Sequence, residues 1–584
     1  MQARSYIRAL LALAFSAFHV FAREQPVDAA LLPLADLKPG QRGEVWTVFS
    51  GTQPEPFAVE VTGVVRNALG PGRSLILCQL TDPRVQNMGA VAGMSGSPLY
   101  VDGKLAGALS YQIQRFETVR YAGFTPAADL AEVQAKTTPT LQAVPITATP
   151  DSGYKSLQPV FTMSGLSPAV AALFAPQFAA LGLSATALGG SDNSSSIENR
   201  KSKIENSTPL RAGAAVSVAL ATGDITLAGT GTVSRLEGTR VTAFGHPLLS
   251  LGEVDLPLCS AEIITILPSN MQSIKVANTG AVIGTISQDR LSAISGTLGP
   301  GPAMVAVEVN VSPVRGDKRN LHFSVVRHQQ LTPVLVATGV SQAILGSNDS
   351  GFANGFRLRG DIMFPGSAPI ATSAIYSGPQ GFQQGLNDFV QGLAASLQNP
   401  YEKTFPERVA FTVEPLAENP TVVVDQFQLS RAVARAGDTV QIMLAWRDWQ
   451  GAAHREIIDL PIDAAWTGKQ LEVILGPGRA LDDLTGRPRV ISAATLRSFN
   501  AYLAALRDDR PNDGLCLAVV EKTEMFTDQT VGTPDAPGSF ERIARAADEA
   551  RFQKRDALLP LWERHVLAGK LSGVLVRRAL RVGE

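Results

Sequence analysis

Residues 91–111 read VAGMSGSPLYVDGKLAGALSY, and this stretch decides the fold. Ser95 stands between two glycines, a pattern that permits a tight turn with an exposed hydroxyl and free backbone N–H groups. Pro98 favours extended backbone just after the turn. The strand-like run that follows is divided by Asp-Gly at 102–103, a pair typical of a two-residue hairpin turn. A serine turn followed by a β-hairpin differs from the nucleophile of an α/β-hydrolase, which is followed by a helix.

The serine turn holds the groups that acyl transfer requires. Such chemistry needs a nucleophilic oxygen and two donors directed at the developing oxyanion. Ser95 supplies the oxygen, and the N–H groups of Gly93 and Ser95 are the expected oxyanion hole. The alternative is a glycine-serine turn with no chemistry.

A serine nucleophile needs a base, and histidine is scarce in this chain. Only His246 ends a strand-like run, in GTVSRLEGTRVTAFGHPLLSLGEVDLP at 231–257. Pro247 imposes extended backbone on His246, so the imidazole is expected at a strand end facing a cleft. The other histidines beyond the first 22 residues are interpreted as ordinary, partly exposed side chains: His322, His328, His454 and His565.

Both segments resemble the SpoIVB-type serine peptidases, a family with a chymotrypsin-like fold. The family motif GMSGSP carries the nucleophile and precedes a short hairpin, and a strand containing G-T and ending in G-H carries the base. The resemblance implies Ser95 as nucleophile and His246 as general base. In the family the histidine segment comes first, whereas here Ser95 precedes His246. The segments 36–126 and 212–315 must therefore pack together, because geometry and not chain order defines a catalytic triad.

The acid that orients the imidazole is less well defined by the sequence. The family carries an acidic residue shortly before the serine, and Asp82 lies in the matching stretch LTDPRVQNMGAVAGMSGSP. The alternative for Asp82 is a turn residue before Pro83. Asp255, nine residues after His246, is a second candidate.

Composition excludes other classes of function. Of 584 residues, 51 are Lys or Arg and 52 are Asp or Glu, so no basic field for nucleic-acid binding is present. No zinc-protease, P-loop or dinucleotide motif occurs, and no cofactor or metal is expected. The three cysteines, Cys78, Cys259 and Cys516, are far apart and define no disulfide framework.

The N-terminus predicts export. Arg4 and Arg8 precede an apolar run at 9–21, and Ala22 ends a plausible cleavage site. A secretory signal peptide therefore places the mature chain in the periplasm, the cell envelope or the medium. The alternative is an uncleaved membrane anchor, although the run is short for a span. No later apolar run is long enough to cross a membrane.

The remaining pattern predicts a mainly β protein with some α structure. We expect a chymotrypsin-like double β-barrel core formed by two separated segments, followed by a C-terminal β-sandwich and an α/β tail. Helices are expected at 126–136, 166–182, 380–397, 492–508 and 539–555, with Ser492 as an N-cap. The expected boundaries are a signal peptide at 1–22, the serine half at 36–135, an α/β insert and polar linker at 136–211, the histidine half at 212–320, a mixed extension at 321–415, the sandwich at 416–490 and the C-terminal region at 491–584.

Two functions fit this organisation. The first is an exported serine endopeptidase acting on protein or peptide substrates, with the chain itself a further candidate substrate through its polar loop at 190–211. The second is a catalytically inactive, peptidase-like envelope scaffold that binds a partner. The separation of Ser95 from His246 in the folded chain would distinguish them.

Overall fold

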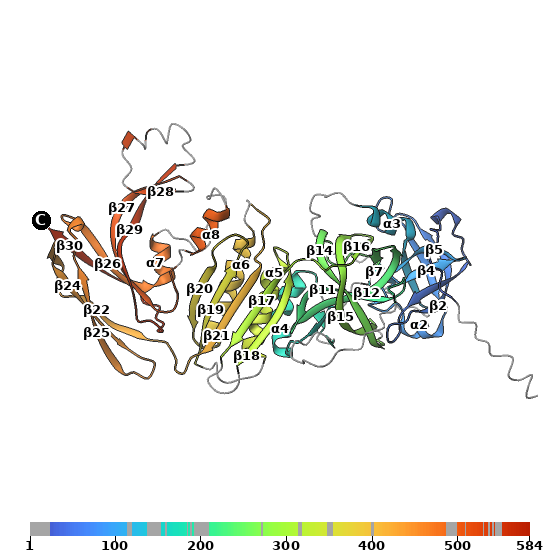
Figure 1. The fold of residues 1–584 in the computed structure, drawn as a ribbon, viewed down its shortest axis with the longest axis horizontal. Coiled ribbons are helices and arrows are strands. Elements are labelled where there is room, and N and C mark those ends of the chain that lie inside the picture. Colours follow the sequence, from blue (N-terminus) through green and yellow to red (C-terminus); the bar gives the residue numbers. More distant parts are fainter. Residues whose placement is uncertain are drawn as a thin grey trace, which may run out of the picture. The chain divides into compact units, whose positions relative to one another are not determined.

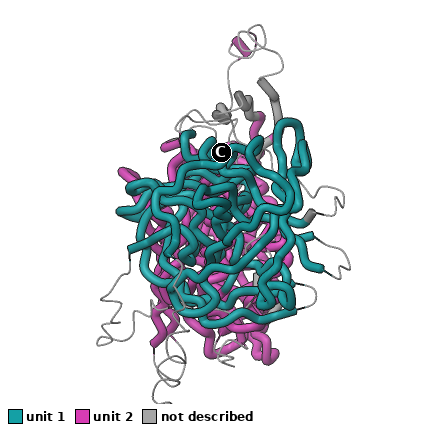
Figure 2. The backbone as a smooth tube through the Cα atoms, turned by 90° about the vertical axis from the view of Figure 1, so that its right-hand side faces the viewer, with its two compact units in different colours: residues 1–162, 201–218, 229–301 teal, residues 163–200, 219–228, 302–584 magenta. Residues whose placement is uncertain are grey.

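The computed structural model divides the chain into two compact units, coloured separately in Figure 2. Unit 1 comprises 1–162, 201–218 and 229–301, and unit 2 comprises 163–200, 219–228 and 302–584. The structure describes residues 24–113, 119–136, 154–157, 161–183, 185–186, 190–191, 209–269, 272–312, 318–346, 354–398, 402–485, 499–507, 510–528, 531–534, 538–539, 542 and 552–584.

The serine segment of unit 1 folds into a closed six-stranded antiparallel barrel (Figure 1). The order around the ring is β4-β1-β2-β3-β6-β5, and a β4–β5 pairing closes it. Burial alternates along β2, as expected for a strand with one face in the barrel core. The strands are β1 (Arg42–Thr47), β2 (Glu55–Val65), β3 (Leu75–Leu80), β4 (Pro98–Val101), β5 (Lys104–Ile113) and β6 (Tyr121–Pro126).

The predicted hairpin after the serine turn is confirmed as β4 and β5. Asp102 and Gly103 join the strands with φ values of 51° and 74°, the left-handed geometry that a two-residue turn requires. The turn fixes the register, with Pro98 opposite Ala108. The serine turn is thereby held at the start of β4.

The histidine segment forms a second ring of pairings. Its order is β11-β14-β15-β16-β13-β12, and a β11–β12 pairing closes the ring. The expectation of a mainly β, chymotrypsin-like barrel fold is confirmed. The strands are β11 (Ala215–Gly223), β12 (Thr226–Glu237), β13 (Arg240–Ala243), β14 (Gly252–Leu267), β15 (Ile274–Arg290) and β16 (Ala293–Leu298).

Unit 2 contains a mixed sheet with the order β20-β19-β21-β17-β18. β17 and β21 pair in parallel, and the other neighbours are antiparallel. The polypeptide between β18 and β19 forms a buried helix, α5 (Leu331–Leu345). The strands are β17 (Met304–Val311), β18 (Arg319–Val326), β19 (Phe356–Met363), β20 (Ile370–Tyr376) and β21 (Arg408–Pro415).

The C-terminal sandwich is present, and it extends into the region predicted as a separate tail. A three-stranded sheet, β22-β24-β25, shares one apolar core with a second sheet of β23, β26, β27, β28, β29 and β30. The strands are β22 (Val423–Leu429), β23 (Val433–Arg435), β24 (Thr439–Arg447), β25 (Ala453–Pro461), β26 (Gln470–Pro477), β27 (Leu515–Asp528), β28 (Val531–Pro534), β29 (Phe552–Val566) and β30 (Val576–Gly583).

Most of the predicted helices are observed. These are α3 (Ala127–Ala135), α4 (Pro168–Ala180), α6 (Gly378–Leu397) and α8 (Phe499–Arg507). The prediction of a polar helix at 539–555 is wrong for residues 552–555, because these residues belong to β29, which begins at Phe552 and pairs with β27. Most of its remainder, and Ser492, lie outside the described residues. None of the helices in the described ranges combines the length and hydrophobicity that a membrane span needs.

Candidate active site

The serine turn lies between a short helix, α2 (Pro83–Met88), and β4. Gly93 and Gly96 adopt φ values of 97° and 94°, which only glycine adopts without strain. They bend the chain sharply on either side of Ser95. Ser95 itself is fully buried.

The turn leaves two N–H groups unused. Among the described residues, neither the Gly93 N–H nor the Ser95 N–H donates a hydrogen bond, although the N–H groups around them do. These are the two donors that the sequence predicted for an oxyanion hole. The neighbouring backbone N–H groups all donate to carbonyl oxygens: Ala92 to Ser273, Met94 to Val91, Gly96 to Leu109 and Ser97 to Met94.

The two serine hydroxyls of the turn differ in their partners. Ser97 Oγ donates to the Met94 carbonyl at 2.6 Å and so stabilises the turn. Ser95 Oγ is buried and has no hydrogen-bond partner in the described part of the chain. A buried hydroxyl without a partner is costly unless it has another role. The contrast favours Ser95 as the reactive serine.

The strands around His246 hold the serine turn directly. Thr232 N donates to Ser95 O at 2.8 Å, and Thr232 Oγ1 donates to Gly93 O at 3.0 Å. A Cβ at Gly96 would overlap the Thr232 carbonyl and the Phe244 backbone nitrogen. The structure therefore brings the serine and histidine segments together despite their order in the chain.

The His246 imidazole is fully buried. Nδ1 lies 2.7 Å from the Pro247 carbonyl oxygen. A carbonyl can only accept, so Nδ1 carries the proton and Nε2 is left as the basic nitrogen. Nε2 makes no hydrogen bond of good geometry within the described ranges.

Burial lowers the pKa of His246 to about 4, against the smaller opposing effects of the Pro247 and Leu157 backbones. The imidazole is therefore neutral, as a general base must be, at all but acidic pH. In this closed arrangement Ser95 Oγ and His246 Nε2 are both buried, and neither is hydrogen-bonded to the other. Catalytic hydrogen bonds often form only when substrate is bound.

Asp82 has a different set of partners. Its carboxylate accepts from Arg84 N at 2.9 Å, caps α2 and pairs with the Arg84 guanidinium at 3.0 Å. Burial raises the pKa of Asp82, but the hydrogen bonds from Arg84 outweigh burial and lower it. None of its observed contacts joins it to His246. The alternative given by the sequence, a turn residue before Pro83, describes what Asp82 does here.

A third carboxylate, Asp289 on β15, was not recognised from the sequence. It is fully buried and accepts from Leu248 N at 2.7 Å, Leu249 N at 2.9 Å and Leu251 N at 3.0 Å. Burial raises the pKa of Asp289, and these N–H donors oppose the rise. Asp289 thus fixes the loop that follows His246. Asp255, the other sequence candidate, lies on β14 with its pKa raised by burial and by Glu253, and no contact with the imidazole is observed.

Lys275 also borders the serine turn. Its backbone N–H donates to Ala92 O, and its side chain packs where a Cβ on Gly93 would lie. Lys275 Nζ donates to Thr47 Oγ1 at 2.8 Å. Burial lowers the pKa of Lys275 to about 7. The sequence offered no signal for this lysine, because it sits in an ordinary strand pattern.

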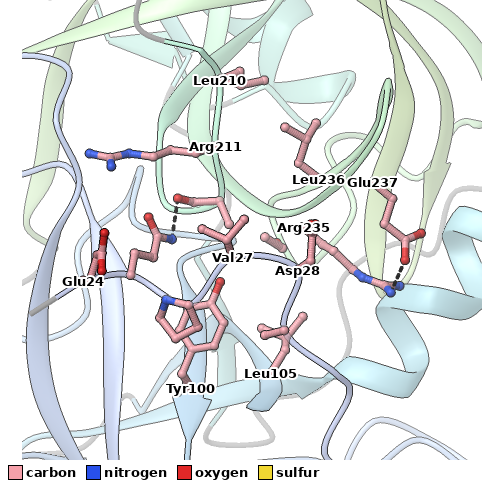
Figure 3. Close-up of a pocket in the computed structure, with 15 residues that line it drawn as sticks. Glu24, Val27, Asp28, Tyr100, Leu105, Leu210, Arg211, Arg235, Leu236 and Glu237 are labelled. Atoms are coloured by element: carbon pink, nitrogen blue, oxygen red, sulfur yellow. Dashed lines mark hydrogen bonds and ion pairs between the residues drawn. The ribbon is translucent and has the colours of Figure 1, made fainter. Parts of the chain in front are cut away.

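A cavity of about 350 Å³ in unit 1 lies apart from these groups (Figure 3). Residues 24–29, which follow the predicted cleavage site, form one part of its wall, and Gln25 Nε2 donates to Ala212 O at 2.8 Å. Tyr100 and the Arg235–Glu237 ion pair also line it. Neither Ser95 nor His246 contributes to the cavity.

The closed antiparallel barrel that carries the serine turn is that of a chymotrypsin-like barrel fold. Residues 22–124 match the family described as SpoIVB peptidase S55. The resemblance predicted from the sequence is therefore confirmed over this segment, which includes Ser95 and ends before His246. No curated protein and no solved structure gives a significant match.

Proposed function

We propose that the chain is an exported serine endopeptidase in which Ser95 is the nucleophile and His246 the general base. One observation carries the proposal: among the described residues, the N–H groups of Gly93 and Ser95 and the Ser95 hydroxyl have no hydrogen-bond partner. Leaving three polar groups unpaired in a protein interior is unfavourable for stability alone. The match of residues 22–124 to SpoIVB peptidase S55 supports the same class.

The proposed reaction follows from the positions of these groups. Ser95 Oγ attacks the carbonyl carbon of a peptide bond, and its proton passes to His246 Nε2. The carbonyl oxygen becomes an oxyanion between the Gly93 and Ser95 N–H groups. The C–N bond then breaks, and the leaving amine takes the proton from Nε2. Water hydrolyses the resulting ester by the same route and regenerates Ser95.

Asp289 is a positioning residue in this scheme, and it acts through a peptide group. The peptide group between Pro247 and Leu248 makes both bonds. Its carbonyl oxygen accepts from His246 Nδ1 at 2.7 Å, and its N–H donates to Asp289 Oδ1 at 2.7 Å. Linked hydrogen bonds polarise one another. Asp289 thereby favours the Nδ1–H tautomer and stabilises the imidazolium, as a directly bonded aspartate does in other triads. The sequence candidates for this role, Asp82 and Asp255, have no comparable link.

The inactive scaffold stays a competing proposal because Ser95 and His246 are fully buried. Incubation of the mature chain with an unfolded protein such as casein, followed by sequencing of new amino termini, separates the two. Peptidase function predicts new termini that disappear in Ser95→Ala and persist in Ser97→Ala, which removes only a turn-stabilising hydroxyl. Cleavage by Ser95→Ala at the rate of the wild type would refute the assignment. The complete lack of new termini would favour the scaffold.

Export and self-processing are further parts of the proposal. The export signal at 1–22 lies outside the described residues, as does most of the polar loop at 190–211. Amino-terminal sequencing of the secreted chain is expected to begin at Arg23. An intact mass that falls with time in the wild type, but not in Ser95→Ala, would support self-processing.

A further inference from the structure

One edge of β5 is occupied by three segments in succession. Residues 98–101 of β4 pair along its first half, with Pro98 opposite Ala108. The serine turn comes next, where Leu109 N donates to Ser97 O and Gly96 N donates to Leu109 O. A short strand, β7 (Tyr154–Ser156), then pairs antiparallel with residues 111–113.

Leu157 joins β7 to the catalytic groups. Its N–H donates to Ser110 O at 2.9 Å, and Ser110 is the residue of β5 that follows Leu109, the partner of the serine turn. Its side chain is fully buried and belongs to the apolar core of the serine barrel. Its backbone lies close enough to the His246 imidazole to affect the pKa of that ring. A Cβ at Gly245, next to His246, would overlap Ser110 Oγ. Ser110 is therefore in close contact with the chain beside His246 as well as with Leu157.

We propose that residues 154–157 occupy the place of substrate, and that substrates are extended peptides which replace them as an antiparallel strand on β5. This inference rests on the proposed function. An extended peptide in this register has backbone partners on β5, and the residue in the position of Leu157 enters the buried apolar site beside Ser95 and His246. Recognition by strand addition relies on main-chain hydrogen bonds for affinity and on side-chain pockets for selectivity. The expected substrate carries leucine or a similar aliphatic residue at that position.

The segment is suited to being displaced. β7 is three residues long and, within the part of the chain that the structure describes, pairs only with β5. Short edge strands with few partners open at a much lower free energy than the whole fold. Their departure would uncover Ser95 and His246, both of which are fully buried while residues 154–157 are in place.

The test compares the rate at which a fluorophosphonate labels Ser95 in the full mature chain and in its Leu157→Gly variant. Glycine removes the buried side chain that anchors the segment, so labelling is expected to accelerate at least tenfold. Lys155→Ala is the matched control, because Lys155 lies in the same strand with an exposed side chain, and it is expected to label at the wild-type rate. The peptide aldehyde acetyl-Tyr-Lys-Ser-leucinal is expected to block labelling of Leu157→Gly, whereas the analogue ending in an aspartate aldehyde is not.

The outcomes separate this inference from the proposed function. Equal labelling of wild type and Leu157→Gly at Ser95 would overturn the inference and leave the peptidase intact. No Ser95-dependent labelling of either folded protein would overturn both. If Leu157→Gly does not fold, the wild type still decides. Its labelling rate should saturate with probe concentration at the opening rate of residues 154–157 measured by hydrogen exchange, and a rate that exceeds that opening would contradict the inference.

Discussion

At the scale of single residues, the neutral imidazole of His246 determines how the reaction depends on pH. A base must be unprotonated to accept the Ser95 proton, and the pKa of His246 is lowered to about 4. The second-order rate of Ser95 phosphonylation by a fluorophosphonate, in which Ser95 Oγ displaces fluoride, is therefore expected to rise through about pH 4 and to be level from pH 6 to 8. A midpoint at or above 6.5, the usual value for histidine, would show that the buried environment of His246 is not the reactive one.

Lys275 makes the stability of the serine barrel dependent on pH. Its pKa is about 7 when folded and 10.5 ordinarily, so the unfolded chain binds more protons between these values, and the free energy of unfolding rises with pH across that window. The rise from this group is at most about 5 kcal/mol. Lys275→Met should be more stable than the wild type at pH 7, with a flatter profile from pH 7 to 10. Urea unfolding at several pH values measures this, and an unchanged slope in the variant would count against a neutralised lysine.

The sequence could nominate Ser95, Gly93 and His246 as candidate site residues, because each lies in a local pattern with a chemical meaning. It could not identify Asp289 or Lys275. Asp289 acts on the His246 loop across the β14–β15 pairing, and Lys275 reaches Thr47 from more than two hundred positions away. Their roles depend on burial and on long-range contacts, and neither property is visible in local spacing.

At the scale of elements, the loop after His246 is held by β15. Asp289→Asn keeps one acceptor but turns an N–H toward donors of the loop. We expect a loss of about 1–3 kcal/mol in the free energy of unfolding and at least tenfold slower labelling of Ser95 by a fluorophosphonate. Asp255→Asn should lower the rate of fluorophosphonate labelling less than twofold, and the same comparison can be made with Asp82→Asn. If Asp255→Asn or Asp82→Asn slows the labelling of Ser95 more than Asp289→Asn does, that aspartate, and not Asp289, orients His246.

Contact between the serine turn and the histidine strands depends on Gly96. A Cβ there would overlap the Thr232 and Phe244 backbones, whereas one at Gly103, in the hairpin turn, would meet nothing within 4 Å. Both glycines have positive φ, so Gly103→Ala measures the conformational strain alone, about 1 kcal/mol. Gly96→Ala should cost several times more in thermal or urea unfolding. Equal losses in the two variants would show that the turn and the strands do not touch as described.

Hairpins were predictable where turn chemistry is explicit, as at Asp102-Gly103, and helices where capping is explicit. Ser167 Oγ accepts from Val170 N at the start of α4. α5 was not predicted, because it is buried on nearly every side and therefore lacks the alternation of polar and apolar residues that marks a surface helix. Its apolar run resembles a buried strand until the packing is known.

At the scale of the molecule, the C-terminal sandwich has a core of its own. All the buried residues of that core lie between Phe427 and Val582. A fragment comprising residues 416–584 is therefore expected to fold alone and to unfold cooperatively in urea, as followed by tryptophan fluorescence and circular dichroism. A fragment with helix and strand signals but no cooperative transition would contradict an independent sandwich.

The serine segment precedes the histidine segment in this chain, the reverse of their order in the family that the two segments resemble. A shared catalytic site implies that segments 36–126 and 212–315 pack together. The hydrogen bonds from Thr232 to the serine turn show how they do so, and the sequence could not predict them. The pairing of β26 with β27 and β30 could not be predicted either, because long stretches of sequence separate these strands.

The central claim is that Ser95 is a nucleophile activated by His246. The most direct measurement is to treat the folded mature chain with a fluorophosphonate and locate the adduct by tandem mass spectrometry. The account predicts one adduct, on Ser95, which is lost in Ser95→Ala, retained in Ser97→Ala and formed at least a hundredfold more slowly in His246→Ala. An adduct on another residue, or equal rates in the wild type and His246→Ala, would contradict it.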